Sequence, residues 1–280
     1  MRLILISGLS GSGKSIALNV LEDTGYTCID NLPVALVEET LRILRESGTA
    51  QVAMSIDARS GPSLEPVRDF VQRIKDQGID LEVLFLDARN DVLLRRYSET
   101  RRRHPLAHGE RTLAECLRME RDILAPVAEI GHRIDTSELS ANQLRDWIKA
   151  LLSIPTGLTA LLFESFGYKG GIPLDADLVF DVRCLPNPYY DPRLQSLTGH
   201  DPEVAEFLER DPQVERMYRD IRAFLETWLP SYLQDNRSYL TIALGCTGGQ
   251  HRSVYLAKRL AVYFGETLPV LVRHREFPLP

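Results

Sequence analysis

The sequence predicts an α/β protein with two domains, each built on a parallel β-sheet, and three observations carry this prediction. In the first half, apolar runs such as residues 3–6, 52–56 and 82–86 alternate with amphipathic helical patterns. Near each end of the chain, an apolar run leads into a glycine-rich turn and then into a helical pattern, at residues 8–15 and 246–253. Strands that alternate with helices through short connections are typical of a parallel sheet covered on both faces.

The elements of the first half follow one another as strand and helix patterns in turn. The helical patterns between the apolar runs lie at residues 15–21, 34–45 and 64–75. A strand-like stretch at residues 132–137 precedes a last helical pattern at 138–152. We expect Thr136 or Ser137 to cap that last helix, because a side-chain oxygen just before a helix can accept from its unpaired amides.

The length of the chain and a break after the first half indicate two domains. A chain of 280 residues is too long for one ordinary hydrophobic core. Pro155 and Gly157 interrupt the helical pattern, so we place the boundary near Ser153, which gives domains 1–153 and 154–280. The second domain shows strand-like runs at residues 158–163 and 240–244 and a helix-rich middle at 204–229.

The composition is that of a globular protein without a broad basic surface. Hydrophobic residues make up 44%, charged residues 26%, and the formal net charge is −6, which argues against wholesale wrapping of nucleic acid. No apolar stretch approaches the roughly 18 residues that span a membrane, so we expect no membrane segment and a cytoplasmic location. Four scattered cysteines fit a reducing compartment and form no metal cluster: Cys28, Cys116, Cys184 and Cys246.

The first glycine-rich turn matches the P-loop pattern G-x-x-x-x-G-K-S in full. Its glycines allow successive backbone N–H groups to point inward, and the following helix adds its N-terminal partial charge. We expect Lys14 to reach the β- and γ-phosphates of a nucleotide and the Ser15 hydroxyl to ligate Mg²⁺. The predicted nucleotide-binding residues are Gly8, Leu9, Ser10, Gly11, Ser12, Gly13, Lys14 and Ser15.

Three aspartates compete for the metal-supporting position of such a site. Asp30, Asp57 and Asp87 each follow or end an apolar run, so each is expected at the carboxyl edge of the sheet, beside the P-loop. We favour Asp57 for the metal and Asp30 for catalysis at a neighbouring acceptor position, although spacing does not rank them. The alternatives for each aspartate are a role as a helix N-cap or simple exposure to solvent.

The segment at residues 95–106 carries five arginines. In small P-loop kinases an arginine-rich flap folds over the phosphates and supplies positive charge. A solvated helix face and a contact with the RNA backbone are the alternatives. The arginines are Arg95, Arg96, Arg101, Arg102 and Arg103.

The second glycine-rich turn has the C-x5-R-S spacing of a phosphatase signature loop, from Cys246 to Ser253. A nucleophilic thiolate is one interpretation, but Gly245 stands where those phosphatases usually have histidine, and no general acid is evident beyond Asp177, Asp181 and Asp191. We favour a phosphate-binding site without catalysis, and a purely structural turn is the third option. The candidate ligand residues are Cys246, Thr247, Gly248, Gly249, His251 and Arg252.

Motifs along nearly the whole chain resemble those of the RapZ family, the bacterial RNase adapter proteins. They include the P-loop stretch, "SIDAR" and "RRYSETRRRHPL" in the first half, and "FESFGYKGGIPLDADLVFDVRCLPNPYYDP" and "GCTGGQHRSVYLA" in the second. The resemblance implies a kinase-like P-loop NTPase domain followed by a second α/β domain. It also implies binding and slow hydrolysis of ATP and GTP. The segment associated with GTP corresponds to Asp57, Ala58, Arg59 and Ser60.

For the second domain, the resemblance implies binding of small regulatory RNA and sensing of glucosamine-6-phosphate, an amino-sugar phosphate. Enteric members hand the RNA to an endoribonuclease and form homo-oligomers. Arg273 and Arg275 correspond to basic residues near the RNA-binding end of the family, but this chain ends in "RHREFPLP" without the enteric cluster of cations. Tyr189 and Tyr190 stand where the enteric motif has histidine and tryptophan.

A metabolic kinase is the alternative hypothesis. The P-loop, the arginine-rich segment and Asp30 as a base suit transfer of the γ-phosphoryl group of ATP to a small acceptor. This hypothesis assigns no function to most of the second domain. We therefore expect a regulatory nucleotide-binding protein with weak hydrolysis.

Overall fold

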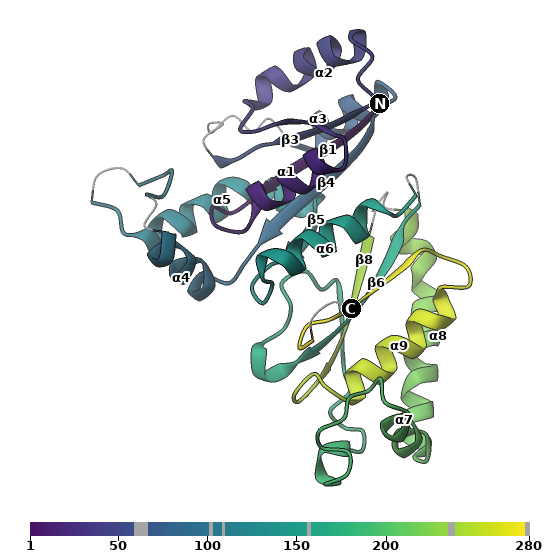
Figure 1. The fold of residues 1–280 in the computed structure, drawn as a ribbon. Helices are drawn as coiled ribbons and strands as arrows, with labels where there is room; N and C mark the ends of the chain where they lie inside the picture. The colour runs from purple at the N-terminus through teal and green to yellow at the C-terminus, as the bar shows by residue number, and fades with distance from the viewer. Residues whose placement is uncertain (59–66, 101–102, 108–109, 156–157, 235–238, 278–280) are drawn as a thin grey trace. The chain divides into compact units, whose positions relative to one another are not determined.

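The computed structural model describes residues 1–58, 67–100, 103–107, 110–155, 158–234 and 239–277. The chain divides into two compact units, which we call the N-terminal unit (Met1–Lys149) and the C-terminal unit (Ala150–Pro280). Figure 1 shows that each unit has its own sheet with helices packed on it. None of the described helices combines the length and apolarity that crossing a membrane requires.

The N-terminal unit is built on a five-stranded parallel sheet in the order β2-β3-β1-β4-β5. The strands are β1 (Arg2–Gly8), β2 (Thr27–Ile29), β3 (Gln51–Ser55), β4 (Asp80–Asp87) and β5 (His132–Asp135). The apolar runs predicted as the first, second and third buried strands are confirmed as β1, β3 and β4. The sequence did not reveal β2, which has only three residues.

In the described part of this unit, five α-helices lie between the strands and a sixth follows β5, so the predicted alternation is confirmed. They are α1 (Lys14–Asp23), α2 (Val37–Glu46), α3 (Val67–Asp76), α4 (Asn90–Thr100), α5 (Leu113–Ile130) and α6 (Ala141–Leu152). The long α5 begins at a capping box, in which the Thr112 hydroxyl accepts from the Glu115 amide and the Glu115 carboxylate accepts from the Thr112 amide.

The expected cap of α6 is wrong. Neither Thr136 nor Ser137 caps this helix; Ser140 does, in a reciprocal pair with Gln143, whose side chain accepts from the Ser140 amide at 2.9 Å. Thr136 instead donates from its hydroxyl to the carbonyl of Ser12, inside the glycine-rich loop, at 2.9 Å. A residue expected to cap the beginning of a helix therefore holds the loop.

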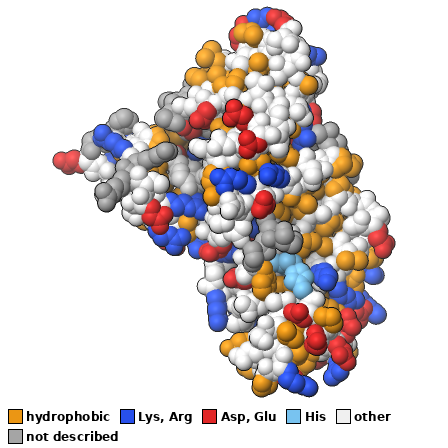
Figure 2. Space-filling model, viewed as in Figure 1, with side chains coloured by type: hydrophobic (Ala, Val, Ile, Leu, Met, Phe, Trp, Pro, Cys, Tyr) orange, Lys and Arg blue, Asp and Glu red, His pale blue; other side chains and the backbone are white. Residues whose placement is uncertain are grey.

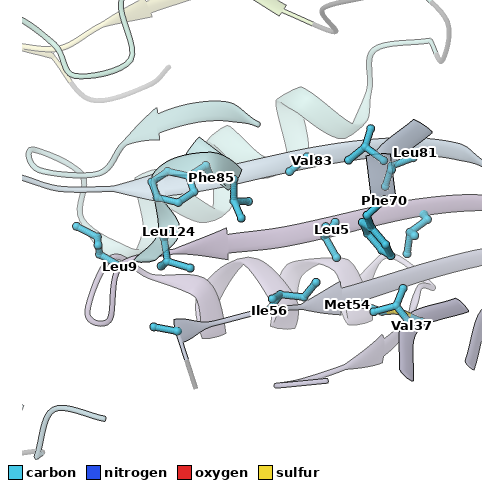
Figure 3. Close-up of a cluster of buried hydrophobic side chains, with 14 of the residues drawn as sticks. Leu5, Leu9, Val37, Met54, Ile56, Phe70, Leu81, Val83, Phe85 and Leu124 are labelled. Carbon is cyan, nitrogen blue, oxygen red and sulfur yellow. The ribbon is translucent and has the colours of Figure 1, made fainter. Parts of the chain in front are cut away.

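The sheet of the N-terminal unit is buried on both faces, as a parallel sheet requires. Leu3 and Leu5 join a cluster with Phe70 of α3 and Leu124 of α5, and Figure 3 shows part of this cluster. Ile4 lies on the opposite face of the same strand and is equally buried. The continuous apolar run of β1 follows from this double burial.

The C-terminal unit is built on a four-stranded parallel sheet in the order β7-β8-β6-β9. The strands are β6 (Ala160–Gly167), β7 (Leu178–Asp181), β8 (Tyr239–Cys246) and β9 (Val270–His274), and the helices are α7 (Pro202–Glu209), α8 (Pro212–Gln234) and α9 (Arg252–Phe264). Helix α9 packs across β6, β8 and β9 (Figure 1). The two predicted strands and the helix-rich middle are confirmed, whereas β7 and β9 were missed.

The two glycine-rich turns follow strands in the interior of the two sheets. In the N-terminal unit the turn follows β1, the first strand along the chain, which lies between β3 and β4. In the C-terminal unit it follows β8, the third strand, which lies between β7 and β6. Both turns therefore lie at the carboxyl edge of a parallel sheet, where such folds bind their ligands.

Candidate functional sites

The glycines of the P-loop are required by close backbone approaches. Gly8 has a φ of 142°, and a Cβ there would lie 2.1 Å from the backbone oxygen of Leu86 on the neighbouring strand. Gly13 has a φ of 109°, and a Cβ there would lie 2.6 Å from a methyl carbon of Leu144. The loop thus runs directly over β4 and α6, which only glycine permits at these two positions.

The loop leaves a set of backbone amides for a ligand. Leu9 donates to the carbonyl of Leu86 at 3.1 Å, and Ser12 donates to the carbonyl of Leu9 at 3.0 Å. Among the described residues, no partner is found for the amides of three loop residues: Gly11, Gly13 and Ser15. These amides stand at the start of α1, where an anion is favoured.

Side chains of the surrounding elements hold the loop from outside. Arg96 of α4 donates to the carbonyl of Gly11 at 3.1 Å and to the carbonyl of Thr136 at 2.6 Å. Lys14 folds back and donates to the carbonyl of Gly8 at 2.5 Å. Among the arginines of the predicted flap that the structure describes, Arg96 is thus placed at the loop, where it binds carbonyl groups. Arg101 and Arg102 lie outside the described residues.

The aspartates at the strand ends differ in their surroundings. Asp87 ends β4 and is buried, and its carboxylate accepts from Arg121 at 2.9 Å and from the amide of Ala88 at 2.7 Å. Because Asp87 already neutralises a guanidinium, it is a poor candidate for a metal ligand.

Asp30 and Asp57 are brought together around Asn31. With its side-chain nitrogen turned toward Asp57, Asn31 donates to both oxygens of that buried carboxylate, at 2.9 and 3.1 Å. The backbone of Asn31 is left-handed, with a φ of 59°, and its amide donates to the Ser55 hydroxyl at 2.8 Å. That hydroxyl donates in turn to exposed Asp30. A left-handed residue that is not glycine stores strain, which is typical of functional sites.

The remainder of the predicted GTP-associated segment is only partly described. Ala58 is buried, and Arg59 and Ser60 lie outside the described residues. In the described part of the chain, no group of three or more His, Cys, Asp or Glu side chains has an arrangement suited to a metal ion.

In the C-terminal unit, Cys246 lies at the base of the second turn. Its buried Sγ accepts from the amide of Gly249 and from the hydroxyl of Ser253, both at 3.2 Å. Burial by itself would raise the pKa of Cys246, but the hydroxyl and amide of Ser253, the amide of His251 and the charge of Arg252 lower it below its ordinary value. The turn thus concentrates donors around one acceptor, as an anion-binding loop does.

Arg252 and His251 support the turn from within. Arg252 is buried and donates to the carbonyls of Arg183 and Leu185 at 2.8 and 3.0 Å, and to the Thr247 hydroxyl at 3.3 Å. His251 is also buried, with its Nε2 3.2 Å from the carbonyl of Leu194. By contrast, Thr247 is exposed and Gly248 is half-buried.

The three aspartates considered as acids for the phosphatase interpretation are each bonded to another group. Among the three aspartates considered, Asp181 is paired with Arg183 at 2.6 Å, and Asp177 accepts from the Thr241 amide at 2.8 Å. The third, Asp191, is paired with Arg193 at 2.8 Å. A side chain at position 245 is excluded, because a Cβ there would lie 2.5 Å from ring carbons of Phe166 and Tyr168.

The end of β9 and the residues after it pack on the end of β6 and beside the second turn, which the sequence did not reveal. His274 Nδ1 lies 2.8 Å from the Ser165 hydroxyl, Arg275 donates to the carbonyls of Gly170 and Gly171 at 2.8 Å each, and the Glu276 carboxylate accepts from the Gly167 amide at 3.2 Å. Gly249 of the turn lies so close to Glu276 that a Cβ there would be 2.4 Å from its Cγ. The segment places an exposed carboxylate beside the turn.

The two arginines proposed for RNA are buried in the C-terminal unit. Arg273 lies 3.7 Å from Glu164 and 3.4 Å from Asp175, and Arg275 is bound to backbone carbonyls as described above. Neither guanidinium is presented to solvent. Tyr189 and Tyr190, in contrast, are 52% and 83% exposed.

His274 predicts a pH dependence of stability. Burial lowers its pKa to about 4, and the nearby charges of His200 and Lys258 add to the effect, whereas an unfolded histidine titrates near 6.5. Because the unfolded chain takes up the proton first, stability is expected to fall as the pH drops from about 6.5 to about 4. In urea titrations at pH 7 and pH 4.5, His274→Gln should reduce that fall by about 2 kcal/mol. An unchanged pH dependence in the variant would contradict this assignment.

The fold and the loop define a P-loop α/β protein with a second α/β unit. Residues 1–155 match the family model described as RapZ-like N-terminal domain, and residues 159–278 match that described as RapZ C-terminal domain. The chain belongs to the RapZ family. This confirms the resemblance noted in the sequence.

Similar proteins extend over nearly the whole chain. A protein named nucleotide-binding protein from Aromatoleum aromaticum is 61% identical over 277 residues, which cover 98% of this chain and 94% of that protein. Another of that name from Methylobacillus flagellatus is 57% identical and covers 98% of each. Among solved structures, shikimate kinase from Bacteroides thetaiotaomicron shares 18% identity at a TM-score of 0.39 and covers 55% of this chain and 99% of that chain. The last likeness is too distant to carry an argument.

Proposed function

We propose that the protein is a cytoplasmic regulator whose N-terminal unit binds ATP or GTP with Mg²⁺ and hydrolyses it slowly. The observation that carries the proposal is the complete P-loop. Among the described residues, the amides of Gly11, Gly13 and Ser15 have no hydrogen-bond partner, so they remain to bind phosphate. The names of the similar proteins support nucleotide binding. Titration calorimetry with ATP and with GTP tests it, and absence of heat with both would contradict it.

In this proposal, three residues divide the chemistry of hydrolysis. Lys14 moves from the Gly8 carbonyl to the β- and γ-phosphates and offsets their charge. Asp57 and the Ser15 hydroxyl would hold a Mg²⁺ ion, which would supply charge neutralisation to the transferring group. Asp30, held by Ser55, is the candidate base for water.

We propose that the second turn binds the phosphate of an amino sugar such as glucosamine-6-phosphate. Its exposed Thr247 and the amide-rich turn around Cys246 suit a phosphate, and the Glu276 carboxylate beside the turn suits the ammonium or hydroxyl groups of the sugar. Because the three candidate acids are each bonded to another group, we favour binding over phosphatase chemistry. Calorimetry with glucosamine-6-phosphate tests this part separately.

Membership of the RapZ family supports a small regulatory RNA, an endoribonuclease and a second copy of the chain as partners. On the face shown in Figure 2, Lys and Arg side chains are interspersed with Asp and Glu side chains. Because Arg273 and Arg275 are buried, any RNA contact would use other cations.

RNA binding is expected to depend only weakly on salt. Each phosphate contact on single-stranded RNA contributes about −0.7 to the slope of log affinity against log salt, so two or three contacts give a slope between about −1.4 and about −2.1. Filter binding from low to high salt measures the slope. A slope near zero, or no binding, would contradict the adapter role.

A second candidate function is a small-molecule kinase, and the strained Asn31 favours it. Asp30 and Asp57 flank this residue at the edge of the sheet, where an acceptor hydroxyl could be deprotonated. Transfer of phosphate from ATP to a sugar or nucleoside at tens of turnovers per second would identify a kinase. Slow phosphate release that no acceptor accelerates would favour the regulatory function.

A further inference from the structure

A buried carboxylate grips the third residue of the P-loop. Glu120 of α5 is fully buried, and its Oε2 accepts from the Ser10 amide at 2.9 Å. Its Oε1 accepts from the Ser10 hydroxyl at 2.6 Å. The amide and the hydroxyl of Ser10 therefore both donate to one side chain, which lies 110 residues further along the sequence.

A histidine completes this arrangement. The side chain of His104 is 1% exposed, and its Nε2 lies 3.1 Å from Oε2 of Glu120. Its Nδ1 accepts from the amide of Leu106 at 3.1 Å, so the ring proton must be on Nε2. A neutral imidazole thus donates to the carboxylate, and Glu120 receives three hydrogen bonds.

The carboxylate remains charged despite its burial. Burial by itself would raise the pKa of Glu120, but the bonds from His104 and Ser10 and the charge of Lys14 lower it below its ordinary value. A buried polar network with every member bonded is rigid, whereas a partly bonded one is costly. Ser10 is therefore fixed before any ligand arrives.

We propose that Glu120 is a positioning residue of the nucleotide site. It holds Ser10, and with it the first half of the loop, so that the amides of Gly11 and Gly13 are already oriented for phosphate. A ligand then binds without having to order the loop. The inference rests on the proposed binding of nucleotide.

Three variants test the proposal by calorimetry with a non-hydrolysable ATP analogue and Mg²⁺. Glu120→Gln removes the charge and replaces one acceptor oxygen by an NH2 group, so the charge-assisted bonds to Ser10 and His104 are lost or weakened, and binding should weaken about tenfold or more. Ser10→Ala removes the hydroxyl bond and keeps the amide bond, so a loss of about threefold to fivefold is expected. Asp122→Asn removes a charge from the exposed face of the same helix and should change affinity by less than about twofold.

A double variant separates positioning from mere stabilisation. Glu120→Ala removes both acceptor oxygens, so the Ser10 hydroxyl then has no partner on this side chain, and Ser10→Ala with Glu120→Ala should bind no more weakly than Glu120→Ala alone. Thermal melts fix a temperature at which each variant is folded. Wild-type affinity in folded Glu120→Gln would overturn the proposal. If that variant does not fold, wild-type affinity in Ser10→Ala would overturn it. Failure of the wild-type protein to bind any triphosphate would instead overturn the proposed function.

Discussion

Replacing Gly249 with alanine is expected to destabilise the C-terminal unit severely, whereas the same change at the neighbouring Gly248 should be tolerated. Gly249 has a left-handed φ of 70°, and a Cβ there would lie 2.6 Å from the amide nitrogen of Gly167 and 2.4 Å from Cγ of Glu276. Backbone cannot move aside as a flexible side chain can, so we expect a loss of more than about 4 kcal/mol in the free energy of unfolding.

Gly248 supplies the matched control. A Cβ at this position would meet no atom within 4 Å, and its backbone is not left-handed. Its replacement by alanine should change the free energy of unfolding by less than about 1 kcal/mol. Urea titrations of both variants make the comparison, and equal stability would show that the segment after β9 does not pack on the turn as described.

A second control distinguishes the contact of a Gly249 side chain with the Gly167 backbone from its contact with the Glu276 side chain. Glu276→Ala removes the flexible side chain and keeps the backbone of Gly167. If backbone is the main obstacle, Glu276→Ala combined with Gly249→Ala should recover little of the lost stability. Full recovery would assign the strain to the Glu276 side chain instead.

The parts of the protein that depend on local pattern could be predicted from the sequence. The P-loop is one continuous segment between a strand and a helix, so its glycines, Lys14 and Ser15 were evident. The N-cap of α6 could also be predicted from local pattern, because Ser140 and Gln143 have the spacing of a capping box. This spacing favours Ser140 over Thr136 and Ser137.

The parts that depend on distant contacts could not be predicted. Ser10 and Glu120 are 110 residues apart, and nothing near Glu120 on the chain distinguishes it from a surface residue of an amphipathic helix. Arg273 appeared to be a free cation near the end of the chain, because its partner Glu164 is contributed by β6 and only the β6–β9 pairing brings them together. Tertiary context decided both roles.

Lys14→Ala is expected to weaken the binding of ATP or GTP by about 100-fold or more. The ammonium group would form charge-assisted bonds with the β- and γ-phosphates, and a hundredfold loss corresponds to about 2.7 kcal/mol. Lys75→Ala, on the exposed side of α3, removes the same charge away from the loop and should leave affinity within about twofold. Calorimetry at low and physiological salt distinguishes the two variants. Because Lys14 is bonded to the Gly8 carbonyl in the free protein, it must exchange one acceptor for another when nucleotide binds. Equal affinity of Lys14→Ala and wild type would therefore mean that the lysine stays on Gly8 and that the loop does not hold a triphosphate.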